Sequence, residues 1–401
     1  MLAEAKDLSE LMVDLAYASV YFGDPDMASE VDALEEHMNE LVQLMRTRCV
    51  LAVRRPKEAE GMSSVLQVVS AIERIANDAV DIARIVTDRV GIPRELVADL
   101  SDAEEVSHRV LLSEGSHMAN MPVAAMELPV ATGMRIMAIR RGRQWITDVT
   151  GEQILQPDDV LFLRGSPDGI ERLRELAAAP VWEPPQPPET TTISDLDRAV
   201  DVLVEMKNLS EMAVGLAYSS LVLGDRGLAQ QVRWLESRLD EMHDRLELWV
   251  LRAASENHDP SPLRGLLHLA NVAEDLGDQA RQMTSIIEQG DVVHPILGIA
   301  LGDSDEIVVQ LPVAAGAAAD AASLEDLALN IEPGFTLLAI RRGDQYVYRP
   351  AGEVVLVVDD EIIASGPYEG REQLAARFGW RLVITEETGE DELVPLHTPV
   401  G

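Results

Sequence analysis

The sequence predicts an α and α+β multidomain protein, in which two three-helix bundles alternate with two small α+β domains. Three observations lead to this fold class. The second half of the chain repeats the first at a constant offset of 201 residues. Within each half, the helical spacing of apolar residues gives way to short β-type runs. A proline-rich segment separates the halves, which indicates a tandem duplication joined by an extended linker.

The repeat is clearest at the start of each half. Residues 6–24 and 207–225 are identical at 11 of 19 positions. Much later, the run Ala138-Ile139-Arg140-Arg141-Gly142 returns as Ala339-Ile340-Arg341-Arg342-Gly343 at the same offset. Because one offset relates segments this far apart, the whole half is duplicated rather than a single motif.

Each half begins with three expected helices. In the first half, Gly23-Asp24-Pro25 ends the first helix. The apolar residues of the second helix are spaced by four and three, and the third runs from about Ser63 to Val90, where Gly91-Ile92-Pro93 stops it. Long amphipathic helices with short connections predict an antiparallel bundle.

The second part of each half reads as short strands followed by a helix. In the first half the strands are expected at Val106 to Leu112, Met134 to Ile139, Gln144 to Asp148 and Val160 to Arg164, with a helix at Asp168 to Ala178. The expected domains are a bundle at 1–97, an α+β domain at 102–179, a proline-rich linker at 180–192, a bundle at 193–293, an α+β domain at 300–381 and an acidic tail at 382–401.

Composition excludes several classes of protein. The chain has 401 residues, 70 acidic and 33 basic side chains, and a formal net charge of -37. Nucleic acid and anionic lipid are poor partners for such a surface, because phosphate groups need a basic footprint. The single cysteine, Cys49, excludes a disulfide within one chain and favours an intracellular compartment. No apolar run approaches the length of a membrane-spanning helix, so a cytoplasmic protein is expected.

The charge also indicates the kind of solution in which the protein is expected to work. Only Lys6, Lys57 and Lys207 are lysine, and the other basic residues are arginine. An acid-rich, lysine-poor surface is expected of a protein in very salty cytoplasm, because a Debye length of about 3 Å at 1 M salt screens the self-repulsion of carboxylates. A cation-binding acidic surface is the alternative interpretation.

The helical part resembles PhoU domains. The run Glu73-Arg74-Ile75-Ala76-Asn77-Asp78-Ala79-Val80-Asp81 is similar to their signature helix, which carries an acid, three residues and another acid. The second half keeps this pair at Glu274 and Asp278, whereas the first half has Asn77 at the second place.

The α+β part resembles the TrkA C-terminal domain, the C-terminal lobe of regulators of potassium conductance. The similarity lies in residues 136–142 with 156–167, and in residues 337–343 with 357–367. Where the family usually has Gly-Asp, this chain has Asp158-Asp159. Together the two resemblances cover nearly the whole chain and suggest a tandem protein of haloarchaeal type.

The acids of the PhoU-like helices are candidate metal ligands. Residues four apart share a helix face, so Glu73 and Asp81, and likewise Glu274 and Asp278, present oxygens along one stripe. Hard divalent cations prefer such oxygens, and the resemblance implies that PhoU proteins can bind metals through these acids. The alternative is a solvated acidic face. In the first half, Asn77 replaces the second acid of the motif, so this helix face carries fewer carboxylates.

The arginine pairs are candidate ligand-binding residues. Arg140 and Arg141, with Arg341 and Arg342, end a strand before a turn glycine, and arginine suits bidentate phosphate recognition. The TrkA C-terminal resemblance implies dimerisation and a small ligand at the subunit interface, cyclic di-AMP in some members. The alternative is that one arginine of each pair bridges nearby carboxylates. The histidines, including His37, His108, His117 and His243, show no ligand spacing.

The expected function is regulatory. No Gly-x-Gly-x-x-Gly fingerprint, P-loop or nucleophile pattern is present, so we expect no catalysis. The resemblances imply a ligand-sensing regulatory subunit that controls a membrane cation transporter or channel, with potassium as the expected ion. A metal-binding PhoU-type regulator of phosphate uptake is the alternative. We expect a homodimer held at the inner face of the membrane through its partner, although two TrkA-like domains in one chain could also pair internally.

Overall fold

The computed structural model describes residues 1–185, 194–256, 261–290, 294–302, 304–343, 345–384 and 391–396. The chain divides into two compact units. Residues Met1–His108 and Trp182–Ser304 form one, which we call the helical unit. Residues Arg109–Val181 and Asp305–Gly401 form the other, which we call the sheet unit. Each unit therefore takes one part from each half of the chain, and each is described by itself.

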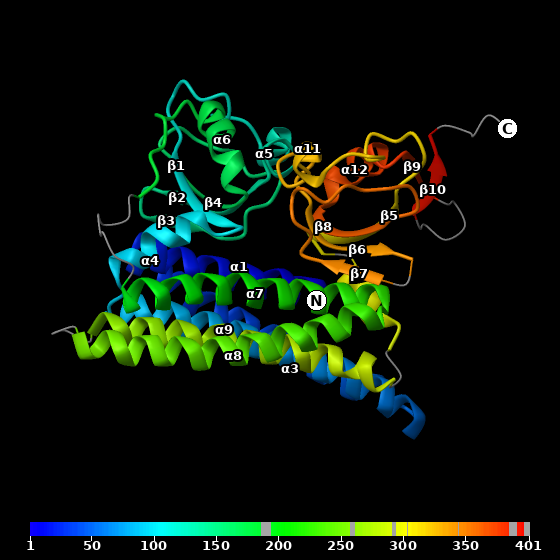
Figure 1. The fold of residues 1–401 in the computed structure, drawn as a ribbon, viewed down its shortest axis with the longest axis horizontal. Helices are drawn as coiled ribbons and strands as arrows, with labels where there is room; N and C mark the ends of the chain where they lie inside the picture. The colour runs from blue at the N-terminus through cyan, green and yellow to red at the C-terminus, as the bar shows by residue number, and fades with distance from the viewer. Residues whose placement is uncertain are drawn as a thin grey trace. The chain divides into compact units, whose positions relative to one another are not determined.

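The helical unit contains the two expected three-helix bundles. In the first half the long helices are α1 (Leu2–Phe22), α2 (Pro25–Ala52) and α3 (Pro56–Thr87), and in the second half they are α7 (Asp195–Leu223), α8 (Arg226–Glu256) and α9 (Ser261–Gln289). The helices run side by side along much of their length (Figure 1). Two short helices, α4 (Arg94–Asp99) and α10 (Ile296–Leu301), pack against α7.

Local sequence explains where these helices begin and end. Gly23 closes α1 with a φ of 59°, a left-handed conformation that glycine adopts without steric cost. Asp24 then caps α2, because its side chain accepts hydrogen bonds from the Asp26 and Met27 amides at 3.1 and 3.2 Å. Gly224 closes α7 in the same way. The break predicted at Gly23-Asp24-Pro25 is confirmed.

The two bundles meet through α3 and α9, and their contacts are reciprocal. The Gln67 side-chain amide donates to the Gln282 backbone carbonyl at 2.7 Å. At the corresponding place in the other half, His268 Nε2 donates to the Asp81 carbonyl at 2.9 Å. Residues 67 and 268, like 81 and 282, are 201 positions apart, so an internal pseudo-two-fold axis relates the bundles.

The sheet unit contains two four-stranded antiparallel sheets of one topology. The first has the order β1 (Val106–Leu111), β4 (Val160–Gly165), β2 (Met134–Arg141), β3 (Gln144–Ile146). The second has the order β5 (Glu306–Pro312), β8 (Glu361–Pro367), β6 (Thr336–Arg342), β7 (Gln345–Tyr348). Even the bulge repeats, between Ile136 and Ala138 in β2 and between Leu337 and Ala339 in β6. The duplication thus preserves strand register as well as sequence.

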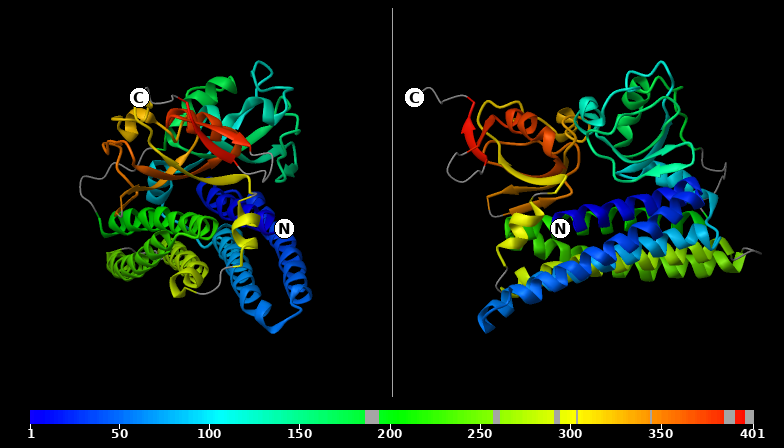
Figure 2. Two further views of the ribbon diagram at one scale, coloured as in Figure 1. Left: turned by 90° about the vertical axis from the view of Figure 1, so that its right-hand side faces the viewer. Right: turned by 180° about the vertical axis from the view of Figure 1, so that it is seen from behind.

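Each sheet is followed by a short helix, α6 (Ile170–Leu176) or α12 (Arg371–Arg377). In the second domain, Leu374 of α12 joins a buried cluster with Ile340 of β6 and Ile362 of β8. This cluster is the core of the domain. Figure 2 shows the ribbon of the whole chain from two further sides.

The two α+β domains also contact each other reciprocally. A methyl group on Gly133 would overlap the carbonyl oxygen of Asn330, and one on Gly334 would overlap that of Pro129. These positions are again 201 residues apart, and both glycines have positive φ, 65° and 84°. The Asn330 side-chain amide adds a hydrogen bond to Ser166 Oγ at 2.9 Å. Both units are therefore internal pairs built from the two halves.

Several elements differ from the sequence prediction. The third helix begins at Pro56 rather than near Ser63, and the short helices α4, α5 (Leu128–Thr132), α10 and α11 (Leu324–Leu327) were not predicted. Part of the expected acidic tail forms a hairpin of β9 (Trp380–Ile384) and β10 (Asp391–Pro395). Residues 186–193 of the expected linker, and 385–390 and 397–401 of the tail, lie outside the described residues.

Candidate functional site

The second arginine of each pair is held by a buried carboxylate. Arg141 donates through Nε and Nη2 to the two carboxylate oxygens of Asp159, both at 2.8 Å, and Asp159 is fully buried. Arg342 makes the same bidentate contact with Asp360, at 2.7 and 2.6 Å. These hydrogen bonds raise the pKa of both arginines. Arg141 and Arg342 therefore hold a turn of their own domain in place.

The carboxylates in these clamps are fixed by the backbone as well. The Gln156 and Val357 amides donate to Asp159 and Asp360 at 2.8 and 2.9 Å. Burial opposes ionisation of Asp360, but the hydrogen bonds from Arg342 and Val357 keep its pKa below the usual value. Sequence reasoning left open whether an arginine of each pair bridges carboxylates, and for Arg141 and Arg342 the structure shows that it does.

The first arginine of each pair lies in a different setting. The Arg140 guanidinium is 5.7 Å from the ring centres of both Trp145 and Phe162. Its counterpart Arg341 forms an ion pair with Glu361. Arg341 and Glu361 also line a pocket of about 500 Å³, together with Gly343, Tyr346 and Asp359. Of the four candidate arginines, Arg140 and Arg341 remain the better candidates for ligand binding.

The candidate acids of the first half are engaged by arginines. Arg46 of α2 contacts both carboxylate oxygens of Glu73. Arg84 contacts Asp81 at 2.6 Å, one helical turn further along α3. Each carboxylate has a cation within its own bundle, so neither is free to act as a metal ligand in this arrangement.

The candidate acids of the second half have neighbours that the sequence did not reveal. His243 Nδ1 lies 3.3 Å from the Glu274 carboxylate, and His243 Nε2 lies 2.7 Å from the Asn271 side-chain oxygen. Asp278 lies beside Glu236, which is buried and forms an ion pair with Arg281. Within the described ranges, no three His, Cys, Asp or Glu side chains converge in a way that would hold a metal ion.

Carboxylates with raised pKa values concentrate around α3 and α9. Burial, followed by the charges of Asp275 and Asp81, raises the pKa of Asp78 to about 8. Burial is also the largest cause of the raised pKa values of three further acids, Glu274, Asp275 and Asp278. The charge of Asp240 adds to the rise at Glu274, and the charge of Asp278 adds to the rise at Asp275. The region has more negative charge than its cations neutralise.

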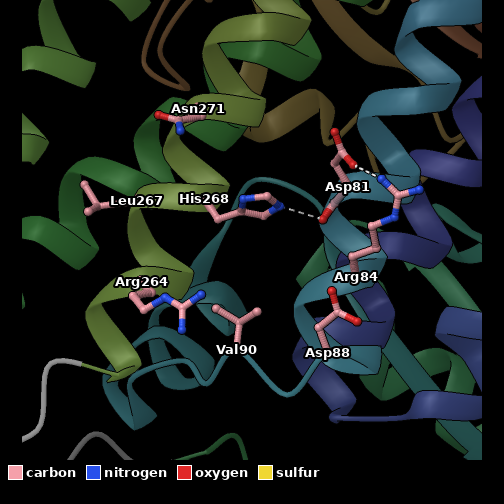
Figure 3. A pocket seen from close by; sticks show the side chains of 8 residues that line it. All are labelled: Asp81, Arg84, Asp88, Val90, Arg264, Leu267, His268 and Asn271. Atoms are coloured by element: carbon pink, nitrogen blue, oxygen red, sulfur yellow. Dashed lines mark hydrogen bonds and ion pairs between the residues drawn. The ribbon is translucent and has the colours of Figure 1, made fainter.

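A pocket of about 450 Å³ opens beside this acidic region, between the end of α3 and the start of α9. Figure 3 shows its walls, with Arg264 and His268 of α9 facing Arg84 and Asp88. The other lining residues are Val90, Asp81, Leu267 and Asn271. Sequence reasoning missed this pocket, because its residues come from both halves of the chain and share no motif.

Comparisons with known proteins agree with the architecture. The PhoU domain family matches residues 2–86 and 203–289, and the TrkA-C domain family matches residues 108–178. This chain is a PhoU and TrkA-C domain protein. The second α+β domain has the same strand order as the TrkA-C domain. No curated protein matches the chain.

Similar solved structures include PhoU from Pseudomonas aeruginosa, at 15% identity and a TM-score of 0.39, over 71% of this chain and 91% of that chain. The GsuK RCK domain is similar at 14% identity and a TM-score of 0.17, over 71% and 69%. The GsuK channel bound to NAD is similar at 12% identity and a TM-score of 0.19, over 80% and 65%. No helix in the described part of this PhoU and TrkA-C domain protein is both long and apolar enough to cross a bilayer.

Proposed function

We propose that the protein is a ligand-sensing regulatory subunit, without catalysis of its own, that controls a membrane cation transporter or channel, with potassium as the transported ion. It works in the cytoplasm and reaches the inner face of the membrane through this partner. The observation that carries the proposal is the combination of PhoU domains with a TrkA-C domain in one chain. A regulatory role is common to both families.

The sheet unit is the proposed sensor. The resemblance to TrkA C-terminal domains implies a small nucleotide ligand, such as cyclic di-AMP, at an interface between two domains. In this chain the two α+β domains contact each other through Gly133 and Gly334, which come just before β2 and β6. Arg140 and Arg341, near the far ends of the same strands, are the proposed anion-binding residues, so we place the anion in each domain away from this contact. A ligand regulates only if it binds one arrangement of the domains better than another.

The pairing of the two halves within one chain affects the expectation of a homodimer. Because each unit already joins its two halves, a second chain is not needed to complete either interface. We therefore propose that the internal pair serves in place of a dimer of chains. Light scattering in multimolar KCl distinguishes the two, since a monomer has a mass of 43.9 kDa and a dimer twice that mass.

A transport assay tests the function itself. In a strain that lacks this protein, we expect altered rubidium uptake at limiting potassium and unchanged phosphate uptake. Complementation with the wild-type chain should restore rubidium uptake, and the double variant Arg140→Gln/Arg341→Gln should not. Unchanged rubidium uptake in the deletion strain would overturn the proposal.

The alternative, a metal-binding regulator of phosphate uptake, has less support. In its favour are the raised pKa values of Glu274 and Asp278, which a divalent cation would lower again. Against it stand the Arg46 contact with Glu73 and the Arg84 contact with Asp81. Altered phosphate uptake in the deletion strain, together with saturable Mn²⁺ binding lost in Glu274→Gln/Asp278→Asn, would favour this alternative.

A further inference from the structure

The pocket between α3 and α9 has an unpaired charge of each sign on facing walls. Arg264 lies in the first turn of α9, and Asp88 directly follows α3 (Figure 3). Both side chains are exposed. Within the part of the chain that the structure describes, neither side chain has an ion-pair or hydrogen-bond partner. A cation and an anion thus face the same cavity without neutralising each other.

The other charged and polar groups of the pocket are already engaged. Arg84 pairs with Asp81 at 2.6 Å. His268 Nε2 donates to the Asp81 backbone carbonyl at 2.9 Å, which fixes the imidazole ring in the wall. The Asn271 side-chain oxygen faces His243. This leaves Arg264 and Asp88 as the charged side chains of the lining that are available to a ligand.

The internal symmetry does not account for these two charges. The position related to Arg264 by the 201-residue offset is Ser63, and the one related to Asp88 is Gln289. His268 and Asp81 correspond to Gln67 and Gln282, which keep the same bridge to the backbone without a charge. The α3 and α9 contact can therefore form with uncharged side chains, so the charges of this pocket are not needed for the packing.

We propose that this pocket binds a zwitterionic small molecule of the amino-acid class, with its carboxylate at Arg264 and its ammonium at Asp88. A guanidinium binds a carboxylate through two hydrogen bonds, and a carboxylate accepts from an ammonium. Val90, which lies between Arg264 and Asp88 in Figure 3, provides apolar contact for the carbon chain between the charged ends. A volume of about 450 Å³ lies within the range of small-molecule sites.

The chemistry of the lining selects the kind of zwitterion. No Trp, Tyr or Phe ring is among the lining residues, so a quaternary ammonium group lacks the aromatic faces that bind it best. An ammonium with N–H donors fits better, because Asp88 can accept its hydrogen bonds. The bound molecule joins α3 of the first half to α9 of the second, and binding therefore stabilises the contact between the two bundles.

Calorimetry with a series of simple probes tests the site. Glycine, β-alanine and γ-aminobutyrate are titrated into the full chain at constant multimolar KCl, because they differ only in the separation of their charges. We expect saturable binding with a preference for one length. Acetate, methylammonium and inorganic phosphate, which each carry charge of one sign, should bind at least tenfold more weakly than the preferred zwitterion.

Paired variants assign the binding to the two residues. Arg264→Gln and Asp88→Asn should each weaken binding of the preferred zwitterion at least tenfold. Arg245→Gln on α8 and Glu36→Gln on α2 change exposed charges that do not line the pocket, and they should leave binding unchanged. All four positions are exposed, so circular dichroism should show folded proteins.

Three outcomes overturn the proposal. They are the absence of saturable binding by every zwitterion, binding of acetate or phosphate as tight as that of the zwitterions, and zwitterion binding that Asp88→Asn leaves intact. The site lies in the helical unit and goes beyond the proposed nucleotide sensor, which uses arginines of the sheet unit. A failure of this titration therefore leaves the rubidium assay unaffected, and the reverse also holds.

Discussion

The ammonium group of Lys6, in α1, lies 5.3 Å from the centre of the Tyr218 ring, in α7 of the other half of the chain. The reverse contact also exists, because Lys207 of α7 lies 5.6 Å from the Tyr17 ring. Lys6 and Lys207 are 4% and 6% exposed, and each contacts a glutamate one turn later, Glu10 or Glu211, at 2.8 Å. Two of the three lysines in the chain thus lie between its two bundles.

These contacts predict the effect of Lys6→Met. The substitution leaves the partly buried Glu10 carboxylate without its cation, and breaking such a pair should lower the free energy of unfolding by about 2–3 kcal/mol. The double variant Lys6→Met/Glu10→Gln should recover part of this loss, because the side chain at position 10 no longer carries a charge that has lost its cation. Recovery is only partial, because Asp7, which lies 3.7 Å from the Lys6 ammonium, keeps its charge. Urea unfolding measures both variants, and additive losses would contradict the coupling.

The pairing of the α+β domains predicts a large effect of Gly133→Ala. The new methyl group would meet the Asn330 carbonyl oxygen, and overpacking of this kind costs about 1–3 kcal/mol beyond the strain of a positive φ. Gly142→Ala is the matched control, because Gly142 has nearly the same φ, 63° against 65°, and no atom within 4 Å. Equal losses of melting temperature in the two variants would show that the contact contributes nothing.

The different partners of Arg341 and Arg342 predict that substituting each one lowers the free energy of unfolding by a different amount. Arg342→Gln leaves Asp360, which is 1% exposed, without its guanidinium and should cost about 2–4 kcal/mol. Arg341→Gln removes a partly exposed pair with Glu361 and should cost no more than about 1 kcal/mol. Thermal unfolding without any ligand compares them. A similar loss in both variants would contradict the different roles given to the two arginines.

The raised pKa of Asp78 predicts a pH dependence. In the folded protein the group keeps its proton up to a pKa of about 8, whereas in the unfolded chain it loses it near the usual value of about 4. The folded state binds more protons between these values, so this group makes stability fall as the pH rises from about 4 to 8. Asp360 has the opposite sign, because its lowered pKa makes stability fall as the pH drops below about 4.

The variant Asp78→Asn isolates this effect. It should gain on the wild type as the pH rises, by roughly 4 kcal/mol between pH 5 and pH 9, because an amide cannot ionise. Asp32→Asn, at an exposed position of α2, should show no such trend. Denaturant unfolding between pH 5 and 9 measures both variants, and a constant difference between Asp78→Asn and wild type would refute the prediction.

The sequence predicted the fold class because its evidence is local or repeated. Helical spacing, turn residues such as Gly23-Asp24-Pro25 and the 201-residue offset need no tertiary information. The hairpin of β9 and β10 was missed because an acid-rich run follows Ile384, although Trp380 and Leu382 pack against the core of the second α+β domain. Their burial depends on a surface that only the folded domain provides.

The roles of the candidate residues depended on contacts that sequence spacing does not show. Arg141 and Asp159 are 18 residues apart on different segments of one domain. Arg264 and Asp88 come from different halves of the chain and line the same pocket because α3 and α9 run in opposite directions. The glutamate and aspartate pairs were visible as helical patterns, but their cations Arg46 and Arg84 and their neighbour His243 were not assigned to them.

The reciprocal contacts between the two halves have a consequence for how the protein responds to dilution. Partners that share a covalent chain have a fixed effective concentration, so neither the Lys6 to Tyr218 contact nor the Gly133 to Asn330 contact weakens as the protein becomes scarce. Covalent joining also allows the two halves to differ in sequence at equivalent positions, as they do at Ser63 and Arg264, which are 201 residues apart. Among the described residues, this contact has one charged pocket where a symmetric dimer would have two, so the proposed zwitterion would bind once per chain and give a hyperbolic dose response.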